Sequence, residues 1–186
     1  MRAVVLVEGE SDRNALEALA ERRGRDLAAE GVAVEPIGGA QAIGRFLERF
    51  GPRGLDVRLA GLYDAGEEPA VRRSLERAGL GSDLTRPEME RLGFYACVQD
   101  LEDELIRSLG PPAVEEVVAA QGELRSFRTF QRQPAQRDVP IEAQLRRFMG
   151  THSGRKIHYG RVLVEALDMA CVPPPLDLVL AHVGRG

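Results

Sequence analysis

The chain has 186 residues, of which 44% are hydrophobic and 29% are charged. This composition is typical of a globular protein and excludes a disordered chain, and the length suffices for one well-cored domain with an appendage. No apolar run approaches the roughly 18 residues of a membrane-spanning helix, and the N-terminus lacks the pattern of a signal peptide. We therefore expect a cytoplasmic protein without membrane association. Cys97 and Cys171 lie in apolar surroundings without C-x-x-C spacing, which predicts reduced core thiols.

The net charge of -4 conceals a separation of charge along the chain. Residues 64–104 contain eleven acidic and five basic residues, whereas residues 125–162 contain nine basic and two acidic residues. Such runs arise from solvated faces as readily as from a site where cations meet a polyanion. Both interpretations remain open at this point.

Strand and helix patterns alternate along the first 110 residues. The β-branched run at residues 3–7 predicts a buried strand, and Ser11 then has the position of a helix N-cap, with Asp12 in the first turn. Repeated β-α units of this length predict a mostly parallel sheet that is covered by helices on both faces. Further strands are predicted over 32–37, 57–63 and 94–98, followed by helices over 40–50, within 64–79 and within 100–110.

The apolar spacing becomes helical throughout after the Gly110-Pro111-Pro112 break. We therefore predict an α/β core over residues 1–110 and a helical C-terminal extension over residues 111–186 that packs on the core. The predicted helices of this extension cover 113–120, 124–132, 141–149 and 156–170, with a short helix after Pro173-Pro174-Pro175.

Acidic residues follow three of the four predicted strands. Glu8 follows the first strand, Asp64 follows the third, and Asp100 and Glu102 come just after the fourth. Functional groups in an open parallel sheet collect beyond the carboxyl ends of the strands, where converging carboxylates repel one another unless a cation joins them. Mg²⁺ is the natural candidate because it prefers oxygen ligands. The same acids also suit helix N-termini, although this alternative is weaker for Glu8 and Asp64.

Three segments, "VVLVEGESD", "GGAQAIGRF" and "LAGLYDAGEE", carry a resemblance to a known family. Together they resemble the TOPRIM domain shared by topoisomerases, primases and the OLD-family nucleases, which implies a Rossmann-like TOPRIM core. In that family a glutamate follows the first strand and a D-x-D pair follows the third; Glu8 matches the glutamate and Asp64 the first aspartate. The form "EGESD", the later "DLEDEL" and a C-terminal lysine look closest to the OLD type. There, additional acids build a second metal site and a lysine assists cleavage, so Asp12 and Glu102 match the acids and Lys156 the lysine.

One departure from the family pattern concerns the second acid of D-x-D, because Gly66 occupies its position. Glu67 or Glu68 is expected to reach the same metal from the following turn. Alternatively, the second metal binds weakly and catalysis is slow or lost. We also expect no ATPase domain of the kind that usually precedes an OLD TOPRIM domain, so that an energy-coupled function is expected to need a separate ATPase chain.

Lys156 is the only lysine among 25 basic residues. A compact ammonium can approach a phosphate as a point charge and stabilise charge that develops during cleavage, although compositional bias alone also leaves a single lysine. The neighbouring arginines are expected to hold a nucleic-acid backbone without reading its sequence. These predicted nucleic-acid contacts are Arg146, Arg147, Arg155, Lys156 and Arg161.

The resemblance implies a Mg²⁺-dependent phosphodiesterase, with Mn²⁺ as a possible substitute, that nicks or cleaves DNA. Glu8, Asp64 and Lys156 are the predicted catalytic residues. A non-catalytic or regulatory nucleic-acid-binding protein is the first alternative. A primase-like phosphotransferase is the second, although the chain has no Walker-type nucleotide signature. The choice between DNA and RNA and the oligomeric state stay open. The predicted metal ligands are Glu8, Asp12, Asp64, Glu67, Glu68 and Glu102.

Overall fold

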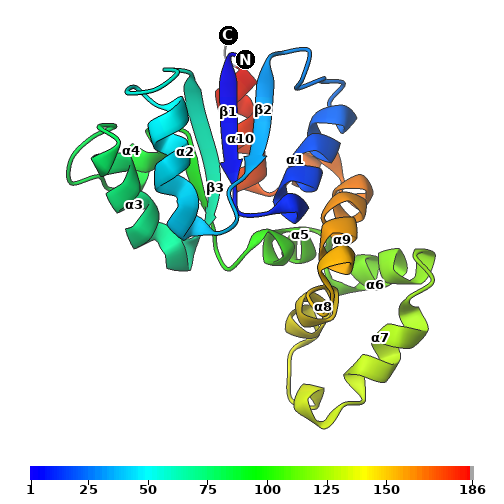
Figure 1. Ribbon diagram of the computed structural model, residues 1–186. Coiled ribbons are helices and arrows are strands. Elements are labelled where there is room, and N and C mark those ends of the chain that lie inside the picture. The colour runs from blue at the N-terminus through cyan, green and yellow to red at the C-terminus, as the bar shows by residue number, and fades with distance from the viewer. Residues whose placement is uncertain (185–186) are drawn as a thin grey trace.

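A sheet of four parallel strands organises the computed structural model, which describes residues 1–184 (Figure 1). The order of the strands is β2-β1-β3-β4, and every neighbouring pair is parallel, which confirms the predicted parallel sheet. Because all four strands point the same way, their carboxyl ends lie along one edge. The strands are β1 (Ala3–Val7), β2 (Val32–Pro36), β3 (Arg58–Asp64) and β4 (Phe94–Cys97).

The strand β1 is buried on both faces, as its unbroken apolar sequence predicts. Val4 and Leu6 belong to a core cluster with one group of helices, while Ala3, Val5 and Val7 belong to a second cluster on the opposite face. The first group is α2 (Ile43–Phe50), α3 (Glu68–Arg77) and α4 (Arg86–Arg91), and the second includes α1 (Glu10–Arg22), α5 (Leu101–Leu109) and α10 (Pro174–Gly184).

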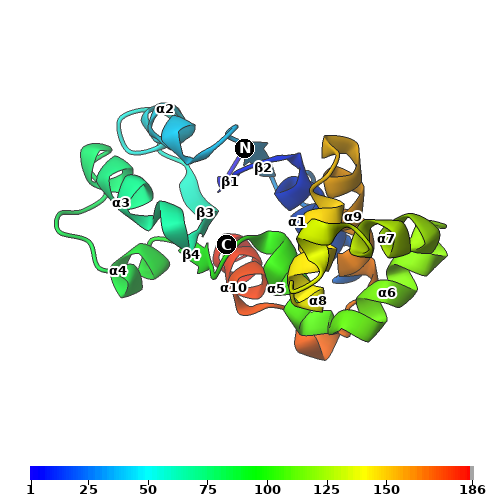
Figure 2. The same ribbon diagram turned by 90° about the horizontal axis from the view of Figure 1, so that it is seen from below.

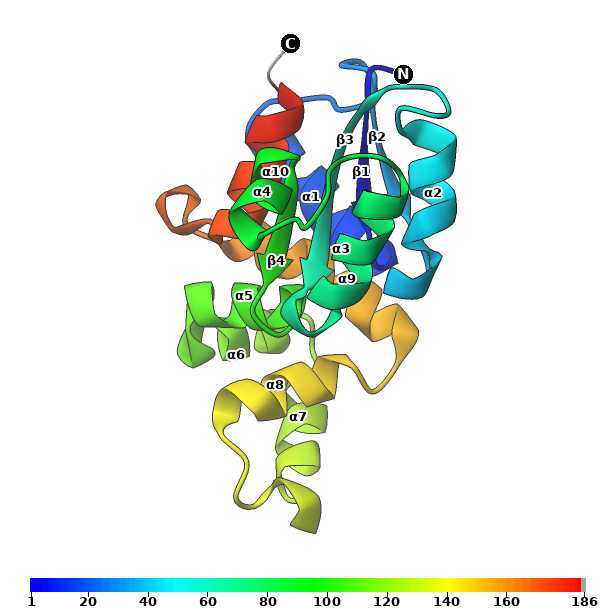
Figure 3. The same ribbon diagram turned by 90° about the vertical axis from the view of Figure 1, so that its left-hand side faces the viewer.

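A helical lobe, which we define as α6 to α8, extends beyond the carboxyl ends of the strands (Figures 1 and 3). Its interior is aromatic: Phe127 and Phe148 are buried with ring centroids 5.2 Å apart, and Phe130 lies 5.7 Å from Phe148. These rings therefore fill a core. The lobe consists of α6 (Pro111–Ala120), α7 (Leu124–Gln131) and α8 (Ile141–Met149).

The chain then returns to the sheet through α9 (Ser153–Ala166) and α10, as the view from below also shows (Figure 2). The helix α9 packs along α1, and α10 packs on β3 and β4. The division of the chain at residue 110 stays a prediction, and the last helix packs directly on the sheet. No helix within residues 1–184 is both long enough and apolar enough to cross a membrane.

Two local predictions are wrong, and one short helix was not predicted. Ser11 is not the N-cap of α1, because the helix starts two residues earlier than predicted, at Glu10, with Gly9 as its cap. The helix α4 was not predicted; it has only six residues and is started by a capping box between Thr85 and Glu88. Cys97 is a buried free thiol as expected, whereas Cys171 is exposed, since it lies in a surface 3-10 turn, Met169–Cys171.

Candidate active site

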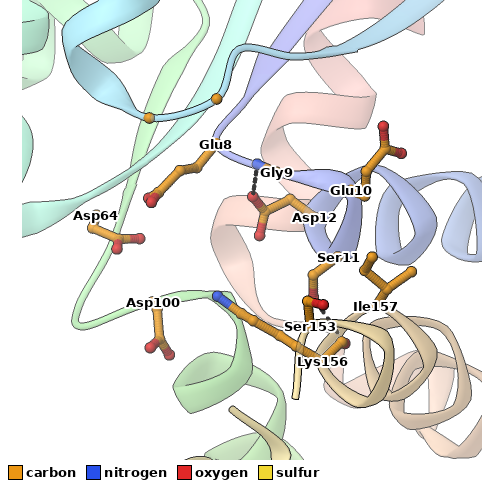
Figure 4. Close-up of a pocket in the computed structure, with 12 residues that line it drawn as sticks. Glu8, Gly9, Glu10, Ser11, Asp12, Asp64, Asp100, Ser153, Lys156 and Ile157 are labelled. Atoms are coloured by element: carbon orange, nitrogen blue, oxygen red, sulfur yellow. Dashed lines mark hydrogen bonds between the residues drawn. The ribbon is translucent and has the colours of Figure 1, made fainter. Parts of the chain in front are cut away.

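A pocket of about 330 Å³ lies where the carboxyl ends of β1 and β3 meet the first turns of α1, α5 and α9 (Figure 4). Residues at or just after the ends of all four strands line the pocket, because each strand ends at this edge of the sheet, and the start of α9 adds to the wall. Glycines complete the wall: Gly38 and Gly39 after β2 donate their N–H groups to the Glu8 carbonyl oxygen at 3.0 and 3.4 Å, so they form a turn and not a free phosphate nest. The charged residues around the pocket are Glu8, Glu10, Asp12, Asp64, Asp100 and Lys156.

The turn between β1 and α1 aims two of three acids at the pocket. The Gly9 N–H donates to Asp12 Oδ2 at 2.8 Å, so Asp12 folds back over the start of its own helix. Glu8 points toward Asp64 from the end of β1, whereas Glu10 points away (Figure 4) and pairs with Arg13. The sequence "EGESD" therefore places Glu8 and Asp12 on the same side of the turn.

The electrostatics of this pocket favour protons or a cation. Burial, followed by the charge of Glu102, raises the pKa of Asp12 to about 7. Burial, followed by the charges of Glu8 and Asp100, raises the pKa of Asp64 to about 7. Each carboxylate is thus costly to ionise beside the others. A divalent cation bound among them would remove this repulsion.

Lys156 enters the pocket from α9 and is held from behind by a buried carboxylate. Its Nζ lies 3.3 Å from Oε2 of Glu102, which is only 2% exposed, although the geometry is not that of a hydrogen bond. The Ser11 hydroxyl donates to Oε1 of Glu102 at 2.6 Å. Burial works against the charge of Lys156, but Glu102, Asp12 and Asp100 outweigh it and raise the pKa of the ammonium. Lys156 therefore stays protonated at neutral pH.

A close crossing of α1 and α9 fixes this arrangement. A Cβ at Gly160 would lie 2.5 Å from the Ser11 carbonyl oxygen and 2.8 Å from its hydroxyl oxygen. Only glycine allows the two helices to approach this closely, and Lys156 stands one helical turn before the crossing. The Ser11 hydroxyl therefore connects three helices. It belongs to α1, donates to Glu102 of α5 and lies against Gly160 of α9.

Asp100 lines the pocket although the predicted metal ligands did not include it. It is the N-cap of α5, where its side chain accepts from the Asp103 N–H at 2.8 Å, and its other oxygen lies 3.4 Å from Nε of Arg146. The sequence signal was its position directly after the fourth strand. Helix capping and pocket lining are compatible, because a carboxylate has two oxygens.

The structure does not bring the two glutamates after Gly66 into the pocket. Glu68 pairs with Arg72 and Arg86, at 2.5 Å each, and neither Glu67 nor Glu68 lines the pocket. The position of Gly66 itself is open, since a Cβ built there meets no atom within 4 Å. Glu102 also lies outside the pocket wall, behind Lys156.

Arg155, predicted to contact nucleic acid, is instead bound within the protein. Its guanidinium donates to Glu123 from Nε and Nη2 at 3.0 and 2.8 Å and stacks over the ring of Phe148, 4.2 Å from its centroid. The side chain is 17% exposed. Arg155 thus fastens α9 to the helical lobe.

The remaining predicted arginines differ in their surroundings. Arg146 pairs with Asp100 at the edge of the pocket, and Arg161 pairs with Glu21 at 2.5 Å on the outer side of α1. Arg147 is exposed, and it has no ion pair within residues 1–184. Arg146 is therefore linked to the pocket through Asp100, whereas Arg161 is not.

The donor set fits a hard divalent cation. Glu8, Asp12, Asp64 and Asp100 offer only oxygen ligands, and burial together with neighbouring carboxylates raises the pKa values of Asp12 and Asp64. No group of three or more His, Cys, Asp or Glu side chains within residues 1–184 is already gathered closely enough to hold a metal.

Comparisons with known proteins agree with the fold of this chain. Residues 1–65 match the family model described as "Overcoming lysogenization defect protein-like, TOPRIM domain". The C-terminal region of the Xanthomonas campestris pv. campestris OLD protein has 22% identity and a TM-score of 0.74, over 98% of this chain and 91% of that one. The C-terminal region of the Burkholderia pseudomallei OLD protein has 17% identity and a TM-score of 0.76, over 98% and 96%. No curated protein sequence matches the chain significantly.

Proposed function

We propose that this chain, which carries an OLD-like TOPRIM domain and has the fold of OLD C-terminal regions, is a Mg²⁺-dependent phosphodiesterase that nicks or cleaves DNA. The observation that carries the proposal is the convergence of Glu8, Asp12, Asp64 and Asp100 with Lys156 in one pocket. A surplus of carboxylates beside a single ammonium suits an anionic substrate only when a cation is also present.

Glu8 and Asp64 would hold the principal cation, with Asp12 and Asp100 beside them. When bound, Mg²⁺ activates water for in-line attack on a phosphodiester and neutralises the departing oxygen. Mn²⁺ suits the same oxygen ligands. Glu67 and Glu68 are no longer part of the proposed ligand set, because they lie outside the pocket wall.

Lys156 would donate to a non-bridging oxygen of the scissile phosphate. Its side chain is 44% exposed and lines the pocket, while the buried Glu102 pairs with its ammonium. This arrangement orients a charged donor before the substrate arrives, which is the main requirement for stabilising charge that develops in a transition state. We assign Glu102 the role of orienting Lys156.

A non-catalytic nucleic-acid-binding protein is the second candidate, and Gly66 favours it. The position that carries the second acid of D-x-D in the family pattern has no side chain, and no other acid of the following turn replaces it in the pocket. A protein that binds DNA and one cation without cleaving would satisfy the same geometry.

The test is nicking of supercoiled plasmid by the purified protein with Mg²⁺ or Mn²⁺. Glu8→Ala and Lys156→Ala should each lower the rate by roughly 100-fold or more, since the first removes a ligand of the cation and the second removes a charge at the reacting phosphate. Glu10→Ala is the matched control, because Glu10 belongs to the same turn but points away, and it should cleave like wild type. Equal residual nicking by wild type and Glu8→Ala would exclude the nuclease. DNA binding without nicking would then support the second candidate.

A further inference from the structure

A second pocket of about 380 Å³ lies on the helical lobe, between α7, the end of α8 and the start of α9. Its lining contains two arginines, three hydroxyl side chains, a glutamine, a histidine and two phenylalanine rings, and it contains no aspartate or glutamate. This composition is the opposite of the acidic pocket. A surface with cationic and hydroxyl donors over an aromatic floor suits a phosphate and the sugar or base next to it.

The residues at the start of α9 separate the two pockets and line both of them. His152 and Thr151 line the second pocket, whereas the next residue, Ser153, lines the acidic pocket. In the same way, Arg155 lines the second pocket and Lys156 lines the acidic pocket. Consecutive Cα atoms are about 3.8 Å apart, so the walls are separated by little more than the first turn of α9. An extended strand with one phosphate at Lys156 would cross this turn and enter the second pocket.

Several donors in the second pocket are available to a ligand. Arg125 is exposed and forms no ion pair within residues 1–184, and Ser126 beside it is also exposed. Arg155 is not available, since Glu123 holds its guanidinium. Phe130 is only partly buried and forms part of the floor. Arg125 is therefore the side chain that gives the pocket its uncompensated positive charge.

We propose that this second pocket is a subsite for a backbone phosphate of the DNA strand that flanks the cleaved bond. Arg125 and the Ser126 hydroxyl bind the phosphate, and the Phe130 ring contacts the adjoining sugar or base without selecting a sequence. The inference rests on the proposed function, because it takes the acidic pocket as the place of cleavage. Charge complementarity and continuity with the acidic pocket select a polyanion as the occupant.

The test compares Arg125→Ala with Arg137→Ala, an exposed arginine of the same lobe that does not line the pocket. Binding of a fluorescein-labelled oligothymidylate is followed by anisotropy in EDTA over a series of salt concentrations. Arg125→Ala should weaken binding roughly threefold to tenfold. It should also lower the salt dependence by about 0.7 in the slope of log K against log salt, as expected for one lost contact to a single strand. Arg137→Ala should change neither quantity.

A second measurement separates the subsite from the cleavage site. With Mg²⁺, Arg125→Ala should raise KM for the oligonucleotide and leave hydrolysis of bis(4-nitrophenyl) phosphate unchanged, because that small diester reaches only the acidic pocket. If Arg125→Ala and Arg137→Ala bind the oligonucleotide equally, with the same salt slope, the subsite is refuted even if plasmid is cleaved. If wild type cleaves neither substrate, the proposed function fails, while the binding series still decides on the subsite.

Discussion

The turn after β1 and the turn after β3 both bring acids to the pocket, but the turn after β1 is packed more tightly. The β1 turn is fixed by the Gly9–Asp12 hydrogen bond and by the contact of Ser11 with Gly160 across two helices. The β3 turn carries Asp64 and then open space at Gly66. One side of the site is therefore determined by packing, whereas the other accepts new side chains. Substitutions at the two turns should differ accordingly.

The largest expected effect is on the tightly packed side. Gly160→Ala should lower the free energy of unfolding by about 1–3 kcal/mol, because its Cβ would press against the Ser11 backbone and force α1 and α9 apart. Gly66→Ala is the matched control and should stay within about 0.5 kcal/mol of wild type. Urea denaturation followed by circular dichroism measures both. Equal stabilities of the two variants would contradict the proposed difference between the turns.

The next effect concerns pH and involves acids of both turns. Asp12 and Asp64 have pKa values raised to about 7, so folding takes up protons between about pH 4 and pH 7. The metal-free protein should accordingly lose stability as the pH rises through this range. Mg²⁺ must displace these protons, so its affinity should fall roughly tenfold for each pH unit below 7 and each proton released.

Thermal unfolding with and without MgCl₂ measures this linkage. The rise in Tm caused by MgCl₂ should be larger at pH 8 than at pH 6. Asp64→Asn is the control, since it removes one of the two titrating carboxylates from the open side and should reduce the pH dependence of the metal effect. The same rise in Tm at both pH values would contradict the assignment of these acids to the cation.

The smallest expected effect is a gain in Mg²⁺ affinity from a substitution in the turn after β3. Gly66→Asp completes the D-x-D pattern, and the open space at this position receives the new side chain. Mg²⁺ affinity, measured by calorimetry, should increase roughly threefold to tenfold, because an added carboxylate adds a charged ligand. Gly66→Asn supplies the same shape without the charge and should bind Mg²⁺ like wild type. A Gly66→Asp variant no tighter than Gly66→Asn would show that the β3 turn points elsewhere.

Local sequence patterns were sufficient for the sheet and for the acids at its edge. Short apolar runs, β-branched in β1, predicted the four strands, and the chain direction then placed Glu8 and Asp64 together, because parallel strands end at a common edge. The start of α1 was misplaced, since Ser11 has the right residue type for a cap while its hydroxyl is used by Glu102, 91 residues away. Propensity does not reveal such a distant partner.

Ion pairing limited the prediction of charged site residues in the same way. The pairing of Glu68 with Arg72 has helical i,i+4 spacing and was readable from the sequence, but the second partner, Arg86, comes from another helix. Arg155 is likewise bound by Glu123, 32 residues before it. Whether a charged residue can reach a ligand depends on the partners that the fold brings to it, and some of those partners come from distant segments.

The segment of the chain that forms the helical lobe begins and ends beside the acidic pocket. Glu102 lies just before the chain leaves the sheet layer, and Lys156 lies just after it returns. Their ion pair of 3.3 Å holds the two ends of this segment together. The entropic cost of closing such a loop rises by only about 0.6 kcal/mol for each doubling of its length. The length of the lobe can therefore change at little entropic cost, while the Glu102–Lys156 ion pair keeps the ammonium beside the acids of the pocket.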